Sequence, residues 1–160
     1  MKVIIQRVLN AKCVVNEENV SEITSGMMLL VGFTNGDSVE QIDKMVKKII
    51  NLRIFEDENK KMNLSIQKVN GEILSISQFT LYANPYEGNR PSFIDALNPH
   101  DASNLYDLFN QKLSDALGKK VKTGIFGEDM KLHIVCDGPV TISLESVSYT
   151  HLRAHETLAN

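Results

Sequence analysis

Short apolar runs alternate with polar turns along the first part of the chain. Four of these runs have the length and the β-branched content of strands: residues 2–9, 11–16, 20–24 and 26–33. The polar segment 16–19 separates two of them, and Asn35-Gly36-Asp37 ends the last. The pattern therefore predicts four successive strands, of which the first contains Val3-Ile4-Ile5, apolar enough to be buried on both faces.

Apolar residues recur at helical spacing in two other segments. In the first segment they form one stripe at i, i+3, i+4, i+7 and i+8: Ile42, Met45, Val46, Ile49 and Ile50. Ser38, followed three residues later by Gln41, has the pattern of a capping box. A helix is therefore predicted over residues 39–52. A second helix is predicted over residues 101–117, with Gly118 suited to end it.

Residues 75–82 combine β-formers with polar side chains in the middle of the segment. Strand alternation divides them between two faces, Ser75, Ser77, Phe79 and Leu81 against Ile76, Gln78, Thr80 and Tyr82. Neither face is purely apolar, which indicates a strand that forms the wall of a site. The alternative is a half-exposed strand whose hydroxyl groups face water.

The rest of the chain carries turn signals and a proline inside a strand pattern. Asn70-Gly71 predicts a turn, three of the four prolines fall in a loop predicted over 83–99, and residues 121–126 read as a short strand. The last strand pattern covers 131–135 and 140–144, and Asp137-Gly138-Pro139 interrupts it. Because proline cannot donate to a sheet ladder, this strand must break, bulge or lie at an edge, unless the three residues form a plain turn.

The composition is that of one globular domain. The 160 residues are 42% apolar and 23% charged, with a net charge of −3. No apolar run approaches the roughly 20 residues of a membrane span, and Arg7 interrupts any signal-peptide pattern, so a cytoplasmic protein without a membrane partner is expected. The negative net charge argues against a protein that coats DNA or RNA non-specifically, although Lys47-Lys48 and similar clusters offer local basic patches. Cys13 and Cys136 are expected to be reduced and buried.

Residues 147–160 differ in character from the rest of the chain. Much of this segment resembles the translation of a transposon sequencing adapter, so we interpret it as a non-native tail from sequence assembly. A genuine short C-terminal extension is the alternative. The domain is accordingly placed at residues 1–146.

The residue types favour backbone chemistry over metal or side-chain nucleophile chemistry. Outside the tail, His100, His133 and the two cysteines lack the spacing of metal ligands, so neither a metal nor a cofactor is expected. Neither a glycine-rich phosphate loop nor a Gly-x-Ser-x-Gly motif occurs. What remains are N–H groups along 75–82 and carbonyl groups at Gly138-Pro139. Backbone donors of this kind can hold an ester carbonyl or an oxyanion.

Two motifs together resemble those of the D-aminoacyl-tRNA deacylase family: Ser77-Gln78-Phe79-Thr80-Leu81 and Asp137-Gly138-Pro139-Val140-Thr141. Other segments resemble the family in the same order and at similar spacing: Gln6-Arg7-Val8, Arg53-Ile54-Phe55, Lys61-Met62-Asn63-Leu64, 88–93 and 123–127. The resemblance covers residues 1–146. It implies an α/β fold: a compact single domain with a mostly antiparallel, curved, barrel-like sheet and two main helices, working as a homodimer.

The resemblance also implies a reaction. The protein is expected to bind the acceptor end of aminoacyl-tRNA and to hydrolyse the ester of a D-amino acid, releasing the D-amino acid and free tRNA. Mischarged glycyl-tRNA is a further expected substrate. By resemblance the catalytic positions are Ser77, Gln78, Phe79 and Thr80, and the positions for substrate binding and chiral selection are Gly138, Pro139, Arg7 and Leu81. A Gly138-cis-Pro139 dipeptide from the partner subunit would exclude L side chains, and Arg7 would support it.

The role of Thr80 stays open between two views. Either its hydroxyl attacks the ester, or the 2′-OH of the tRNA assists while N–H groups along 77–80 position the substrate. The second is favoured because no base is evident beside Thr80. Cys136 stands where the family usually has Asn, and a thiol cannot reproduce the donor and acceptor of an amide. The alternative functions are an inactive homologue that binds tRNA or another ligand, and a small-molecule esterase that uses Ser77 or Thr80.

Overall fold

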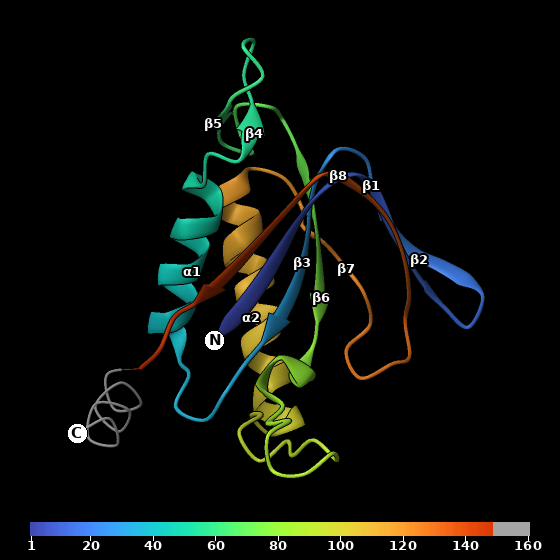
Figure 1. Cartoon of the computed structure of the whole chain (residues 1–160), viewed down its shortest axis with the longest axis vertical. Coiled ribbons are helices and arrows are strands. Elements are labelled where there is room, and N and C mark those ends of the chain that lie inside the picture. Colours follow the sequence, from blue (N-terminus) through green and yellow to red (C-terminus); the bar gives the residue numbers. More distant parts are fainter. Residues whose placement is uncertain (149–160) are drawn as a thin grey trace.

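Strand β1 (Lys2–Val15) is the strand to which most of the sheet is attached in the computed structural model, which describes residues 1–148 (Figure 1). It pairs antiparallel with β2 (Glu18–Ile23), β3 (Gly26–Gly32) and β8 (Lys131–Glu145). The sheet continues with parallel pairs from β3 to β6 (Glu72–Ser77) and from β6 to β7 (Lys122–Thr123). A separate hairpin is formed by β4 (Phe55–Glu56) and β5 (Met62–Leu64).

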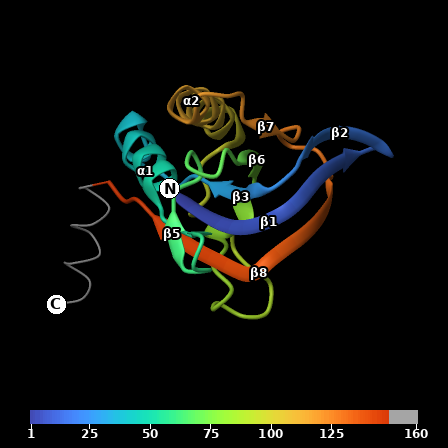
Figure 2. The same cartoon turned by 90° about the horizontal axis from the view of Figure 1, so that it is seen from above.

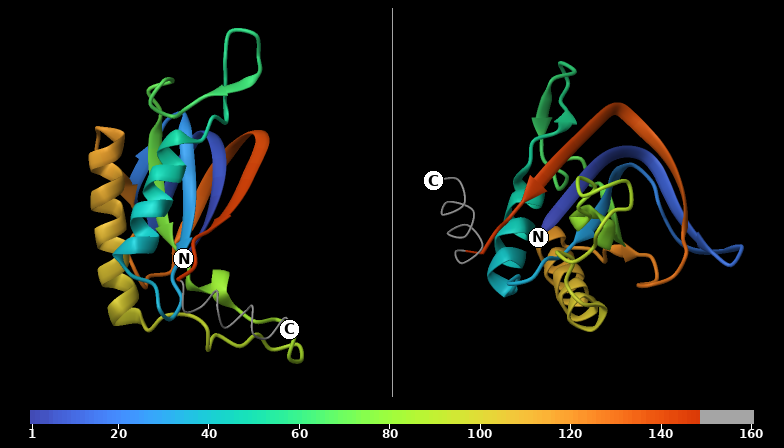
Figure 3. Two further views of the ribbon diagram at one scale, coloured as in Figure 1. Left: turned by 90° about the vertical axis from the view of Figure 1, so that its left-hand side faces the viewer. Right: turned by 60° about the horizontal axis from the view of Figure 1, so that its bottom comes forward.

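Helices α1 (Val39–Asn51) and α2 (Pro99–Leu117) lie together on one face of this sheet (Figures 2 and 3). The predicted capping box at the start of α1 is present, since Ser38 and Gln41 bond to each other's backbone. Helix α2 begins two residues earlier than predicted because Asn98 caps it, with Pro99 in the first turn. Gly118 ends it in the left-handed conformation, as the sequence predicted.

The curved, barrel-like sheet separates two apolar cores. The larger core fills the space between the sheet and the helices and includes Ile5, Leu29, Ile49 and Phe109. The smaller core lies between β1, β2, β3 and β6, and Leu132 and Ile134 of β8 pack against it. The predicted fold class, with two helices and a mainly antiparallel curved sheet, is confirmed. The parallel pairs β3–β6 and β6–β7 make the sheet mixed.

Several predicted boundaries are wrong. The two N-terminal strands are one continuous strand, and only Lys122–Thr123 of the predicted strand 121–126 belongs to the sheet. Most importantly, residues 75–82 are not one strand: β6 ends at Ser77, and Phe79–Tyr82 forms a 3₁₀ turn, η1. The chain leaves the sheet there because its neighbour β3 ends at Gly32, after which residues beyond Ser77 have no partner strand.

The predicted irregularity at Asp137-Gly138-Pro139 is present as a wide bulge in an edge strand. Cys136 pairs with Val8 and Thr141 pairs with Gln6, so four residues of β8 lie opposite Arg7 alone. Strand β8 pairs only with β1, which leaves its other edge unpaired within the described residues. The predicted tail 147–160 lies outside the described residues except for Val147 and Ser148. Among residues 1–148, no helix is both long and apolar enough to cross a membrane.

Candidate active site

A cavity of about 580 Å³ opens where β6 ends. One wall consists of Ser77, Gln78 and Phe79, and the ends of β3 and the start of α2 form the floor. Phe93 and the segment 96–98 form a second wall, and residues 126–130 a third. The lining is mainly apolar, contains the carboxylates of Glu128 and Asp129, and contains no lysine or arginine. A cavity of this size and polarity is typical of a small-molecule or nucleoside site.

The turn η1 presents unpaired backbone donors beside this cavity. Gln78 donates its N–H to the carbonyl of Val31 at 2.7 Å. Leu81 donates its N–H to the carbonyl of Gln78 at 3.3 Å, which closes the turn. The N–H groups of Phe79 and Thr80 donate to no carbonyl or side chain of the described residues, as expected for the first residues of a helical turn. Two adjacent free donors of this kind can hold the oxygen of a polarised carbonyl.

The side chains along η1 offer little acid–base chemistry. The Thr80 hydroxyl accepts a short hydrogen bond from the amide of Gln78 and is exposed. No His, Asp, Glu or Lys side chain is hydrogen-bonded to it within residues 1–148. Leu81 packs against Gly32, where an added Cβ would lie 3.1 Å from the Leu81 Cβ. Neither Thr80 nor Leu81 lines the cavity, whereas Ser77, Gln78 and Phe79 do.

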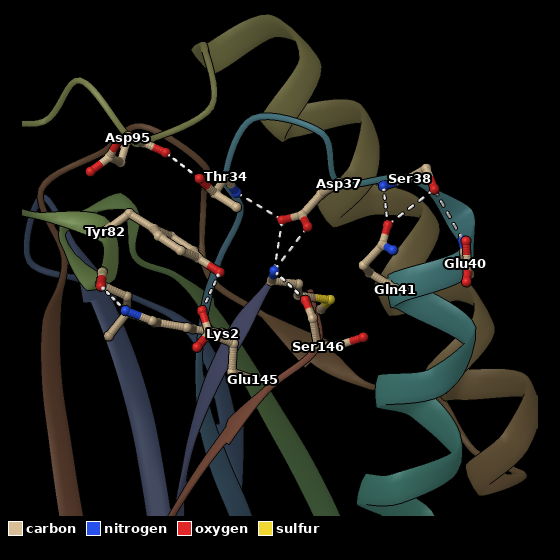
Figure 4. Close-up of polar contacts among 12 residues, drawn as sticks. Lys2, Thr34, Asp37, Ser38, Glu40, Gln41, Tyr82, Asp95, Glu145 and Ser146 are labelled. Atoms are coloured by element: carbon tan, nitrogen blue, oxygen red, sulfur yellow. Dashed lines mark hydrogen bonds and ion pairs between the residues drawn. The ribbon is translucent and has the colours of Figure 1, made fainter. Parts of the chain in front are cut away.

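A polar cluster lies behind η1, at the ends of β1 and β8 (Figure 4). Tyr82 is buried, donates its hydroxyl to Glu145 at 3.4 Å and lies under the ammonium of Lys2, 4.7 Å from the ring centroid. Burial raises the pKa of Tyr82 well above its ordinary value, and the charges of Asp37 and Glu145 act in the same direction. The phenol therefore stays protonated and acts only as a structural donor.

Arg7 supports the bulge that carries Gly138 and Pro139. Its buried guanidinium donates to the carbonyl of Ile54 at 2.8 Å and to that of Asp137 at 3.2 Å, and it lies 3.4 Å from the Asp137 carboxylate. The Gly138-Pro139 peptide bond is cis. Gly138 has φ +124°, and a Cβ there would lie 2.9 Å from the Val140 nitrogen, so only glycine fits. Arg7 thus contacts Asp137, the residue before this dipeptide, and its support of the dipeptide stays a prediction.

The structure keeps the two predicted halves of the site apart within one chain. Ser77 aligns with Val31, and Val31 with Val3, whereas Pro139 lies at the level of Arg7, four residues further along β1. Three strand spacings separate β6 from β8 in the same sheet. With ~4.8 Å between strands and ~3.3 Å per residue, the separation is roughly 15–20 Å across the curved sheet. Gly138 and Pro139 accordingly do not line the cavity of their own chain.

Sequence reasoning missed part of the lining. No motif identifies Phe93, Ala102, Phe126 or Met130 as cavity residues, because a cavity assembled from distant segments leaves no local pattern. The cysteine prediction was half wrong, since both thiols are free but only Cys13 is buried. Among residues 1–148, no three His, Cys, Asp or Glu side chains converge as metal ligands, and the absence of a metal or cofactor stays a prediction.

Comparison with known proteins gives the family. The model of the family described as D-Tyr-tRNA(Tyr) deacylase matches residues 4–145. The chain belongs to this deacylase family. It is 51% identical to the D-aminoacyl-tRNA deacylase of Flavobacterium psychrophilum and 54% identical to that of Listeria monocytogenes. Each match covers 91% of this chain and 97% of the relative.

Solved structures also match the chain. One described as c-Myc DNA unwinding element binding protein is 40% identical, with a TM-score of 0.88, and the match covers 92% of this chain and 100% of that one. A probable eukaryotic D-amino acid tRNA deacylase is 20% identical, with a TM-score of 0.78 over 89% of this chain and 97% of that one, which shows a shared fold. These two matches show that the fold is shared over nearly all of the described residues.

Proposed function

We propose that this protein is a hydrolase that cleaves the ester of D-aminoacyl-tRNA, releasing tRNA and the free D-amino acid. The observation that carries the proposal is the pair of free N–H groups at Phe79 and Thr80, beside an apolar cavity, in a chain of the deacylase family. Mischarged glycyl-tRNA, which has no side chain to reject, is a second proposed substrate. The proposed setting is the cytoplasm, where aminoacyl-tRNA is found.

The lining of the cavity suits the neutral terminal nucleoside of the aminoacyl-tRNA better than the phosphate groups of the tRNA backbone. A phosphate site needs cations or several convergent N–H groups, and the lining contains no lysine or arginine. A terminal nucleoside is apolar on its faces and can stack on the aromatic lining that Phe79 and Phe93 form together. Of the two acidic residues in the lining, Asp129 is paired with Lys131 at 2.8 Å, so Glu128 supplies the charge that complements the positive α-ammonium group of an aminoacyl ester.

In the proposed mechanism the backbone positions the ester and no protein side chain attacks it. The N–H groups of Phe79 and Thr80 would hold the ester carbonyl and stabilise the oxyanion that forms as water attacks, with the tRNA 2′-OH assisting and the tRNA 3′ oxygen leaving. Thr80 lacks a base that could take its proton, so its hydroxyl is a poor nucleophile. Ser77 and Gln78 would complete the wall on which the carbonyl rests.

We further propose that a second copy of the chain supplies Gly138 and Pro139 to this cavity. Within one chain the dipeptide lies roughly 15–20 Å from Ser77, by the strand geometry given above. The bulge lies on the unpaired edge strand β8, and apolar side chains around it, Leu9 and Val135, are 52% and 46% exposed. Exposed apolar residues around an unpaired edge favour association with another chain.

The central experiment compares D-Tyr-tRNA and L-Tyr-tRNA as substrates of the purified protein. Cleavage of the D-ester alone supports the proposal. Cleavage of neither ester would favour an inactive tRNA-binding homologue, and cleavage of simple esters without tRNA would favour a small-molecule esterase. Glycyl-tRNA is measured in the same assay.

The contribution of the second copy is tested with mixed dimers. One protomer carries Gly138→Ala, and the other carries Ala102→Trp, which blocks its cavity because Ala102 lines it. The open cavity then faces the intact dipeptide of its blocked partner, so the mixed dimer should reject L-Tyr-tRNA as the wild type does. If it instead shares the altered selectivity of the Gly138→Ala homodimer, the dipeptide acts within its own chain and the proposal fails.

A further inference from the structure

Two of the aromatic residues that line the cavity come from different segments. Phe79 belongs to η1 and Phe93 to the loop before α2, and their rings meet edge to face with centroids 5.1 Å apart. Neither segment lies in a strand. Two backbone hydrogen bonds between Asn84 and Ser92 join the segments to each other, and further contacts hold each of them to the strands. These contacts come from the polar cluster at the ends of β1, β3 and β8 (Figure 4).

Thr34 holds the loop that carries Phe93 in place through a hydrogen bond. Its side chain is buried, and its hydroxyl donates to the carbonyl of Asp95 at 2.5 Å. Thr34 is itself fixed by Asp37, whose carboxylate accepts the Thr34 N–H at 2.8 Å and whose own N–H donates back to the Thr34 carbonyl at 3.2 Å. Two neighbouring hydrogen bonds hold the same loop. Leu97 donates its N–H to the carbonyl of Phe33 at 3.1 Å, and the exposed side-chain amide of Asn35 donates to the carbonyl of Ile94 at 3.4 Å.

Tyr82 ties the other wall. It is the buried end of η1, and its hydroxyl reaches Glu145, the last residue of β8. Lys2, which pairs with Glu145 across the β1–β8 ladder, covers the Tyr82 ring and donates to the carbonyl of Leu81 at 3.4 Å. The turn that presents the Phe79 and Thr80 donors is thus attached through Tyr82 to two strand ends.

We propose that Thr34 and Tyr82 are positioning residues that hold the Phe93 loop and the turn η1 in the relative position required by the aminoacyl ester. This inference rests on the proposed deacylase function. Thr34 acts on the wall that holds the nucleoside, so its loss should weaken substrate binding. Tyr82 acts on the turn that carries the backbone donors, so its loss should slow the chemical step. Neither side chain touches the substrate.

The test separates KM from kcat for D-Tyr-tRNA. Thr34→Val keeps the shape of the side chain and removes the hydroxyl, and we expect KM to rise about fivefold to tenfold with kcat within about twofold, the effect of one lost buried hydrogen bond. Thr34→Ser, which keeps the hydroxyl, should restore the wild-type KM. Tyr82→Phe should lower kcat about fivefold and leave KM unchanged. If Thr34→Val does not fold, Thr34→Ala takes its place.

Thr24→Val is the control, because the Thr24 hydroxyl also donates at 2.5 Å, to Glu72 at the other end of β6. It should change neither KM nor kcat. Wild-type kinetics in Thr34→Val and Tyr82→Phe, or equal changes in Thr24→Val, would overturn the inference while the proposed function stands. A wild-type protein that cleaves no D-Tyr-tRNA would instead remove the proposed function, and the inference with it.

Discussion

Replacing Arg7 with methionine should cost stability and chiral selectivity together. Met has a similar length but neither charge nor donors, so the carbonyls of Ile54 and Asp137 lose their hydrogen bonds from Arg7. The Ile54 bond is buried, and an orphaned buried acceptor costs about 1–3 kcal/mol. The ion pairs with Asp137 and Glu56 add only ~0–1 kcal/mol, because both carboxylates are about half exposed. The expected loss is therefore about 1–4 kcal/mol.

Chemical denaturation of the wild type and the Arg7→Met variant measures this loss as a lower midpoint with an unchanged slope. Arg53→Met is the matched control, since Arg53 also donates to a carbonyl, that of Asn63, but from an exposed position. It should cost less than ~1 kcal/mol. The same variants are assayed with D- and L-Tyr-tRNA. An Arg7→Met protein as stable and as selective as the wild type would refute the view that Arg7 supports the Gly138-Pro139 bulge.

Three further predictions follow from single contacts. Thr80→Ala should keep substantial deacylation of D-aminoacyl-tRNA, and single-turnover rates as low as those of a dead enzyme would restore Thr80 as the nucleophile. Gly32→Ala should strongly reduce activity, because its Cβ would lie 2.8 Å from the Gln78 carbonyl and displace η1; unchanged kcat would contradict this. Glu72 has a pKa below its ordinary 4.5, mainly because the Thr24 side chain donates to it. The stability that this carboxylate contributes is present above that ordinary value and lost as the pH falls through the lowered one. Thr24→Val should therefore destabilise the protein near neutral pH and less in acid, as urea denaturation at several pH values would measure.

The helices and most strands could be predicted because each leaves a local pattern. The stripe from Ile42 to Ile50 and the Ser38–Gln41 box define α1 without reference to the rest of the chain. Gly118 likewise marks the end of α2. The same local reasoning failed at Phe79–Tyr82, where every residue favours a strand. At these residues the chain turns away from the sheet because the neighbouring strand β3 ends at Gly32. The local sequence contains no signal of where a neighbouring strand ends.

The candidate site was predictable only as motifs, because its geometry depends on strand register. The motifs at 77–81 and 137–141 suggest a single pocket when read from the sequence. The register of β1 with β3 and β8 instead puts them on strands three spacings apart and at different heights. The proposed site therefore draws the two motifs from two chains, and it assigns no nucleophilic role to the hydroxyl groups of the first motif. Its most useful groups are the two backbone donors that appear only because the strand ends at Ser77.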